Sequence, residues 1–176
     1  DEIGRTQDGG GTGQVQRLVV PGLSGAHANY IDSLVNANGR LYFRSSYYNN
    51  DFSLYRPLYT LDPGTGAISQ VAGLQYVDGI RYLGGQLFFT ALSSTTQEGY
   101  ELFRIAAGSA QPVVIDVNPG SGSSNARELV EAGGVLYFTA FREGIGYELF
   151  RLDASFNAVP VRDIWPGANS GNPRSF

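Results

Sequence analysis

The sequence predicts an all-β protein of β-propeller-like repeats, with about three four-stranded antiparallel blades in the chain. Three observations lead to this fold class. The hexapeptide GYELFR occurs twice, at residues 99–104 and 146–151. Short runs alternate apolar and polar residues with a period of two, which is typical of strands, and Gly, Pro, Asn and Asp separate them. The repeat length of about 47 residues is the size of a propeller blade.

The chain divides into a tail and one repeat domain. Residues 1–13 form a Gly-rich N-terminal tail with the composition of a linker, and residues 14–176 form the domain. Within the domain we expect a spare strand at 14–20, units at about 29–73, 74–120 and 121–167, and a C-terminal stub at 168–176.

Each unit is expected to contain four short strands. The first strands are expected at 33–35, 76–78 and 128–130, and the second strands at 41–43, 87–89 and 136–138. The third strands are expected at 57–61, 101–105 and 148–152, and the fourth at 68–71, 113–117 and 159–164.

A four-stranded sheet of this size cannot bury both of its faces alone, so we expect the units to stack on one another. A single β-sandwich and a solenoid-like stack are the alternatives. Three blades are too few to close a propeller, which usually needs about four to eight. We therefore expect either a longer array of repeats or several chains that complete one another.

The spare strand is a candidate for assembly. Val15, Arg17, Leu18, Val19 and Val20 would dock on a neighbouring subunit as an added strand, joined by main-chain hydrogen bonds. Repeated head to tail, this exchange makes a fibre, and closed on itself it makes a ring. The alternative is that the strand folds onto the chain's own last blade.

Composition disfavours several functions. The net charge of −4 argues against nucleic acid as a partner, and no segment reaches the roughly 18 apolar residues of a transmembrane helix. With no Cys and one histidine, His27, the chain offers no thiol nucleophile and no His- or Cys-based zinc site. We expect no catalytic residues and no cofactor.

Two carboxylates recur with the repeat, Glu101 and Glu148, and each precedes an arginine by three residues, Arg104 and Arg151. Residues three apart on a strand point to opposite faces, so we expect these charges to pair across strands of neighbouring units. An enzyme with carboxylates in a cleft between blades is the weakest alternative.

Calcium is a weak possibility at the turn that follows each fourth strand. Asp116 and Asn118 place oxygen ligands in one turn, and Asp163 repeats the first of these positions. A complete calcium loop has more carboxylates, so the competing interpretation is a turn whose Asp side chain accepts from local amides.

The connection between the second and third strands varies most among the units and is longest in the first. Variation at one place in a repeat indicates a binding face. Tyrosine and asparagine are good contact residues for a sugar ring or a neighbouring subunit. The candidate binding residues are Tyr47, Tyr48, Asn49, Asn50, Asp51, Phe52 and Tyr55. A self-packed surface loop is the alternative.

These motifs resemble those of a bacterial surface repeat family with the signature ELWxxDGTxxGT, a hyalin-like, propeller-like repeat. The ELW positions correspond to 101–103 and 148–150, the following DIxPGxxSSxP segment to 116–125 and 163–167, and LYFxA to 136–140. The DGT turn is eroded at 105–107 and 153–155. The resemblance covers residues 17–176 and implies a propeller-like fold and a secreted or cell-surface bacterial location.

Together these observations predict a non-enzymatic extracellular protein for structure, assembly or adhesion. Its expected partners are copies of itself or a larger repeat array. A carbohydrate-binding, propeller-like lectin is the alternative function, with a glycan as ligand.

Overall fold

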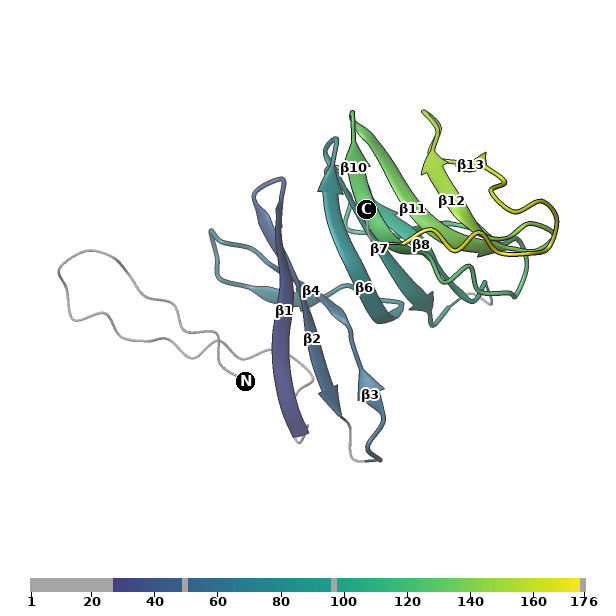
Figure 1. Ribbon diagram of the computed structural model, residues 1–176. Helices are drawn as coiled ribbons and strands as arrows, with labels where there is room; N and C mark the ends of the chain where they lie inside the picture. The colour runs from purple at the N-terminus through teal and green to yellow at the C-terminus, as the bar shows by residue number, and fades with distance from the viewer. Residues whose placement is uncertain (1–26, 49–50, 96–97, 175–176) are drawn as a thin grey trace.

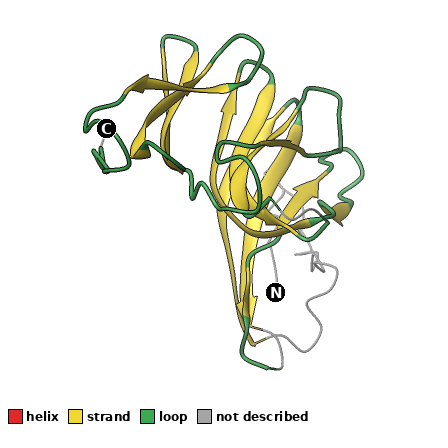
Figure 2. Cartoon of the chain, turned by 90° about the vertical axis from the view of Figure 1, so that its right-hand side faces the viewer, coloured by secondary structure: helices red, strands yellow, loops and turns green. Residues whose placement is uncertain are grey.

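The structure is a computed structural model that describes residues 27–48, 51–95 and 98–174. This part of the chain consists of strands and loops and contains no helix, which confirms the all-β prediction (Figure 2). It follows that these residues include no helix long and apolar enough to cross a membrane.

The strands form three antiparallel sheets of four strands each, and the first sheet has one additional short strand. The first sheet contains β1 (His27–Ala37), β2 (Arg40–Tyr48), β4 (Leu58–Leu61) and β5 (Ile68–Gln70), with β3 (Leu54–Tyr55) paired to β2. The second contains β6 (Leu74–Leu83), β7 (Gln86–Ser93), β8 (Tyr100–Ile105) and β9 (Val113–Ile115). The third contains β10 (Arg127–Ala132), β11 (Val135–Arg142), β12 (Gly146–Leu152) and β13 (Ala158–Arg162).

The first hairpin of each sheet closes with a two-residue turn of the same kind. The turns are Asn38-Gly39, Gly84-Gly85 and Gly133-Gly134, and all six residues have positive φ. Two consecutive positive φ values define the turn that matches the twist of antiparallel strands, which is why Asn and Gly occupy it. These turns set the register of the hairpins and therefore which side chains share a face.

The three sheets stack face to face, and the two junctions between them hold the main hydrophobic clusters. One cluster joins the first and second sheets and includes Tyr42, Leu58, Ile80 and Phe89. The other joins the second and third sheets and includes Phe88, Leu102, Leu129 and Phe138. The second sheet is therefore covered on both faces, as the size of a single sheet requires.

An aromatic pair recurs on the same face of every sheet. Phe43–Tyr59, Phe89–Phe103 and Phe138–Phe150 are directly opposite on neighbouring strands, with ring centroids 5.6, 5.9 and 5.9 Å apart. In the second and third sheets this face packs against the preceding sheet. In the first sheet Phe43 and Tyr59 form the centre of a separate, smaller cluster.

The first strands of the sheets lie beside one another, because β6 contacts both β1 and β10 (Figure 1). Each carries a β-bulge at the same position, where Ser33, Gly79 and Glu128 have φ values of 54, 61 and 55°. Leu34, Ile80 and Leu129 follow the bulge. The expected first strand at 76–78 lies within β6, but the residues equivalent to 33–35 and 128–130 are 79–81, three positions further on.

The described residues form an open series of three sheets and not a closed ring. Three layers also distinguish this arrangement from a single two-sheet sandwich.

Replacing Gly79 with alanine is expected to lower the free energy of unfolding by about 1–2 kcal/mol, since a Cβ is disfavoured at positive φ. The added Cβ would meet its nearest neighbour, Leu129, at an ordinary 3.6 Å, so the backbone conformation and not a clash causes the loss. Chemical denaturation measures it. Glu128→Gly, at the equivalent bulge, is the control and should keep or raise stability; an equal loss in both variants would contradict the role of φ.

Candidate functional site

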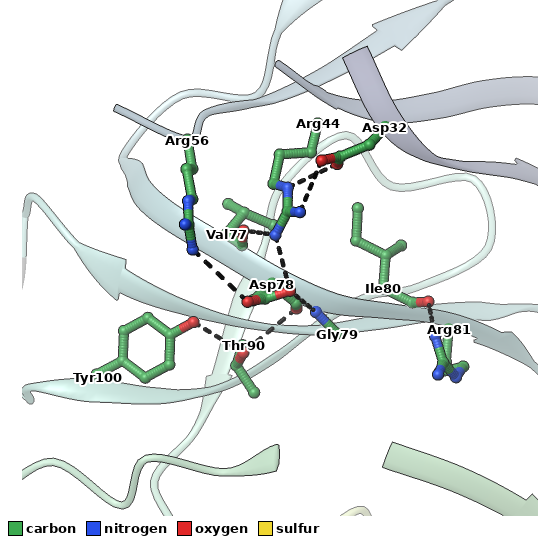
Figure 3. Close-up of polar contacts among 10 residues, drawn as sticks. All are labelled: Asp32, Arg44, Arg56, Val77, Asp78, Gly79, Ile80, Arg81, Thr90 and Tyr100. Carbon is green, nitrogen blue, oxygen red and sulfur yellow. Dashed lines mark hydrogen bonds and ion pairs between the residues drawn. The ribbon is translucent and has the colours of Figure 1, made fainter. Parts of the chain in front are cut away.

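A polar cluster lies where the first strands of the first and second sheets meet (Figure 3). Arg44, on β2, donates from Nε to Asp32 Oδ1 at 2.7 Å and from Nη2 to Asp32 Oδ2 at 2.8 Å. Its Nη1 donates to Asp78 Oδ1 at 2.7 Å and to the carbonyl of Val77 at 3.2 Å. One guanidinium therefore binds a carboxylate of its own sheet and both a carboxylate and a carbonyl of the next.

The register of the hairpin places this guanidinium. Arg44 is directly opposite Asp32, on the face of the first sheet that meets the second. The hydrogen bond from Arg44 lowers the pKa of Asp32, and the same bond raises the pKa of Arg44. Arg56 adds a longer ion pair to Asp78, at 3.8 Å. The charges are matched, so the cluster is built as a tie between sheets.

At the second junction the same position is occupied differently. Thr90 takes the place of Arg44, donating to the carbonyl of Asp78 at 3.2 Å and lying 3.0 Å from the Tyr100 hydroxyl. Burial raises the pKa of Tyr100. Beside them is a cavity of about 350 Å³, which Arg127 and Glu128 also line. Without the guanidinium, this junction keeps an open polar space.

The two recurring glutamates hold loops and not arginines. Glu101 is fully buried and accepts from the backbone N–H groups of Val117 at 2.9 Å and Ser124 at 2.6 Å. Glu148, equally buried, accepts from Ile164 at 3.1 Å and Gly171 at 2.7 Å. The predicted cross-strand ion pairs were therefore wrong.

The position of each glutamate in its unit matches the presence of a long loop after the fourth strand. The partners lie 16 and 23 residues after the glutamate in both units, so each carboxylate fixes the long loop that follows the fourth strand. In the first unit the equivalent residue is Pro57, and only three residues separate β5 from β6. The second and third units, which have a long loop after the fourth strand, have the glutamate, and the first unit, which has a short one, does not. Burial raises the pKa of Glu101 to about 7, and the hydrogen bonds from Ser124 and Val117 offset part of that effect.

The predicted binding residues are partly self-packed. The rings of Tyr47 and Tyr55 are stacked with centroids 5.6 Å apart, and Tyr55 stacks on Tyr76 of β6 at 6.4 Å. Burial raises the pKa of Tyr47. Tyr48 and Phe52 are exposed, and Asp51 accepts from the backbone N–H of Ser53. Asn49 and Asn50 lie outside the described residues.

The weak calcium candidates have local roles. Asn118 is buried, and its side-chain oxygen accepts from the backbone N–H of Glu143 at 2.8 Å. Asp163 accepts from the N–H of Gly167 at 3.2 Å, whereas Asp116 is exposed. Across the described ranges, no three His, Cys, Asp or Glu residues gather where they could hold a metal ion. The assembly strand, with Val15, Arg17, Leu18, Val19 and Val20, lies outside those ranges.

Sequence reasoning missed the exposed apolar residues at the two ends of the stack. Ile80 and Leu129, each 3% exposed, pack against the preceding sheet, but the equivalent Leu34 is 56% exposed. At the other end, Val117 is fully buried beneath the third sheet, but the equivalent Ile164 is 52% exposed. Aligning the repeats position by position would have identified both pairs. These two ends are the strongest candidate for a functional surface.

Searches with the sequence and the structure found no matching family model, no matching curated protein and no matching solved structure.

Glu101→Gln is expected to lower the free energy of unfolding by about 1–3 kcal/mol, because an amide NH₂ would face one of the two buried N–H donors. Thermal or chemical denaturation measures this loss. Glu131→Gln is the matched control, since Glu131 accepts from Gly134 at an exposed turn. The loop-holding role would be contradicted if both variants were as stable as the native chain.

Stability should also depend on pH through Glu101. Its folded pKa of about 7 lies above the ordinary 4.5, so the folded state retains the proton longer as pH rises. The stabilising contribution of the raised pKa is complete below about pH 4.5 and is lost between about pH 4.5 and 7, by about 3 kcal/mol. The free energy of unfolding, measured by chemical denaturation at several pH values in this range, should fall more steeply with pH for the native chain than for Glu101→Gln. Equal pH dependence in the two proteins would contradict the raised pKa of Glu101.

Proposed function

We propose that the chain is a non-enzymatic, extracellular assembly or adhesion protein, a propeller-like stack that joins further sheets of its own kind end to end. The observation that carries this proposal is the exposure of apolar residues at both ends. Leu34 and Ile164 occupy repeat positions that are buried wherever a neighbouring sheet is present. The extracellular location rests on the family resemblance alone.

A second copy of the chain is the partner that fits these ends. Within the stack, the Ile80 or Leu129 side of one sheet meets the sheet before it, so every junction has the same direction. The Leu34 end of one copy would therefore meet the Ile164 end of another. Such a head-to-tail contact closes into a ring or continues as a filament. Two copies together supply six sheets, within the roughly four to eight that close a propeller.

Several further features of the third sheet support the same contact. Its outward face carries Tyr137 and Leu149, the equivalents of Phe88 and Leu102, which are buried under the third sheet. Trp165, beside Ile164, is exposed, whereas the equivalent Asn118 is buried. Strand addition by residues 14–20 would be a second means of joining the same copies.

Leu34→Asp and Ile164→Asp are each expected to weaken self-association by about a hundredfold, or about 3 kcal/mol, since each places a charge in an apolar contact. Sedimentation velocity across a concentration series measures this. Both residues are exposed within one copy, so the fold should tolerate the changes. Val113→Asp, on the exposed fourth strand of the second sheet, is the matched control and should assemble normally.

Mixing the two variants tests the direction of the contact. Each variant retains one intact end, so a head-to-tail contact predicts a mixed dimer that grows no further. A symmetric contact between like ends would leave one variant self-associating on its own and would contradict this geometry. A native chain that remains monomeric at every concentration would refute self-assembly altogether.

Carbohydrate binding is the second candidate, favoured by the ring series Tyr47–Tyr55–Tyr76, of which Tyr76 is exposed. Flat aromatic rings with polar edges suit a sugar ring. If this function holds, a glycan array should show selective binding that Tyr76→Ala lowers about tenfold, or about 1.4 kcal/mol. Tyr82→Ala, an exposed tyrosine on β6 of the second sheet, is the control. An array without selective binding would remove this candidate.

A further inference from the structure

At the second junction one aromatic side chain divides the space beside the turn between β12 and β13. Phe156, in the turn between β12 and β13, lies against Phe88 with ring centroids 6.2 Å apart. The guanidinium carbon of Arg104 lies 4.5 Å from the centre of the same ring. Phe156 has a φ of 64°, a conformation that a bulky residue rarely adopts. Phe156 therefore adopts an unfavourable backbone conformation at the position where its ring lies between the second and third sheets.

The first junction has the same positions without the aromatic ring. Strand register makes Tyr42 the equivalent of Phe88 and Thr60 the equivalent of Arg104. Ser109, in the turn between β8 and β9, is the equivalent of Phe156, in the turn between β12 and β13. Ser109 donates its N–H to the carbonyl of Ala106, and Phe156 donates its N–H to the carbonyl of Asp153, each at 3.0 Å. A small serine thus replaces the inserted phenylalanine.

A cavity of about 450 Å³ occupies this place in the first junction. Tyr42, Leu87 and Ile105 provide an apolar floor, and Gln70, Ser109 and Gln111 provide polar groups. The wall also contains Thr60, whose buried hydroxyl has no hydrogen-bond partner in the described structure. At the second junction, by contrast, Phe156 forms part of the wall of two separate cavities, of about 400 and 360 Å³.

We propose that the cavity of the first junction binds a small molecule with an aromatic ring, in the position that Phe156 occupies at the second. The ring would lie beside Tyr42, as Phe156 lies beside Phe88, and a polar substituent would face the glutamines and Ser109. The volume is within the range of about 300–1,000 Å³ that is typical of small-molecule sites. The site lies inside one copy of the chain, so it is independent of the self-assembly proposed above.

The test is a titration of the isotope-labelled full chain with phenol and indole, followed by NMR of the backbone amides. Both probes should shift the amides of residues 106–111 saturably. Ser109→Phe should place its own ring where the ring of the ligand is expected, and should therefore weaken phenol binding by about tenfold or more. Ser109→Ala also loses the hydroxyl contacts with Gln111 but leaves the cavity open, so it should bind phenol like the native chain.

Cyclohexanol is the control ligand, because it has the size and hydroxyl of phenol without the aromatic ring, and it should bind more weakly. Equal binding of cyclohexanol, no saturable shift with either aromatic probe, or unchanged phenol binding to Ser109→Phe would each overturn the proposal. If Ser109→Phe does not fold, Ser109→Leu, which occupies part of the same space, is used in its place. It should also weaken phenol binding, and unchanged binding would overturn the proposal.

Discussion

The need to cover both apolar faces of a four-stranded sheet governs this structure. Each sheet has one face with a stacked aromatic pair and an opposite face with residues such as Leu58 or Leu102. Among the sheets of the described residues, only the middle one has a sheet of the same kind on each side. The direction of stacking, the exposed ends and the fixed loops over the junctions all follow from that requirement, because a face left in water forfeits the stabilisation that its burial provides.

The all-β architecture could be predicted because its determinants are local. Alternation identified the second and third strands, and Gly, Pro, Asn and Asp marked the breaks between strands. The first strands were harder, because a β-bulge interrupts the period of two. In β6, Tyr76 and Gly79 both have positive φ, so the alternation is interrupted twice, and the predicted first strand was aligned three residues before its true equivalent. No single-residue preference reveals a bulge at a tyrosine.

The polar contacts were less predictable, because their partners are distant or belong to the backbone. Pairing Glu101 with an arginine was a reasonable expectation, but the carboxylate binds two N–H groups of a loop 16 and 23 residues later. The same spacing at Glu148 was present in the sequence and could have suggested a loop contact. The tie from Arg44 to Asp32 and Asp78 occurs at one junction only, so the repeat gave no signal for it.

The two junctions show where a repeat can acquire function. The arrangement of strands at the two junctions is the same. The position of Arg44 at the first junction corresponds to that of Thr90 at the second, where a polar cavity lies beside it. At the turn between the third and fourth strands the difference is the opposite: the first junction has a cavity beside Ser109, and the second has the ring of Phe156. Substitutions at these positions change the space between sheets without changing the strands. Differences between repeats, more than their shared motif, therefore determine what each junction can bind.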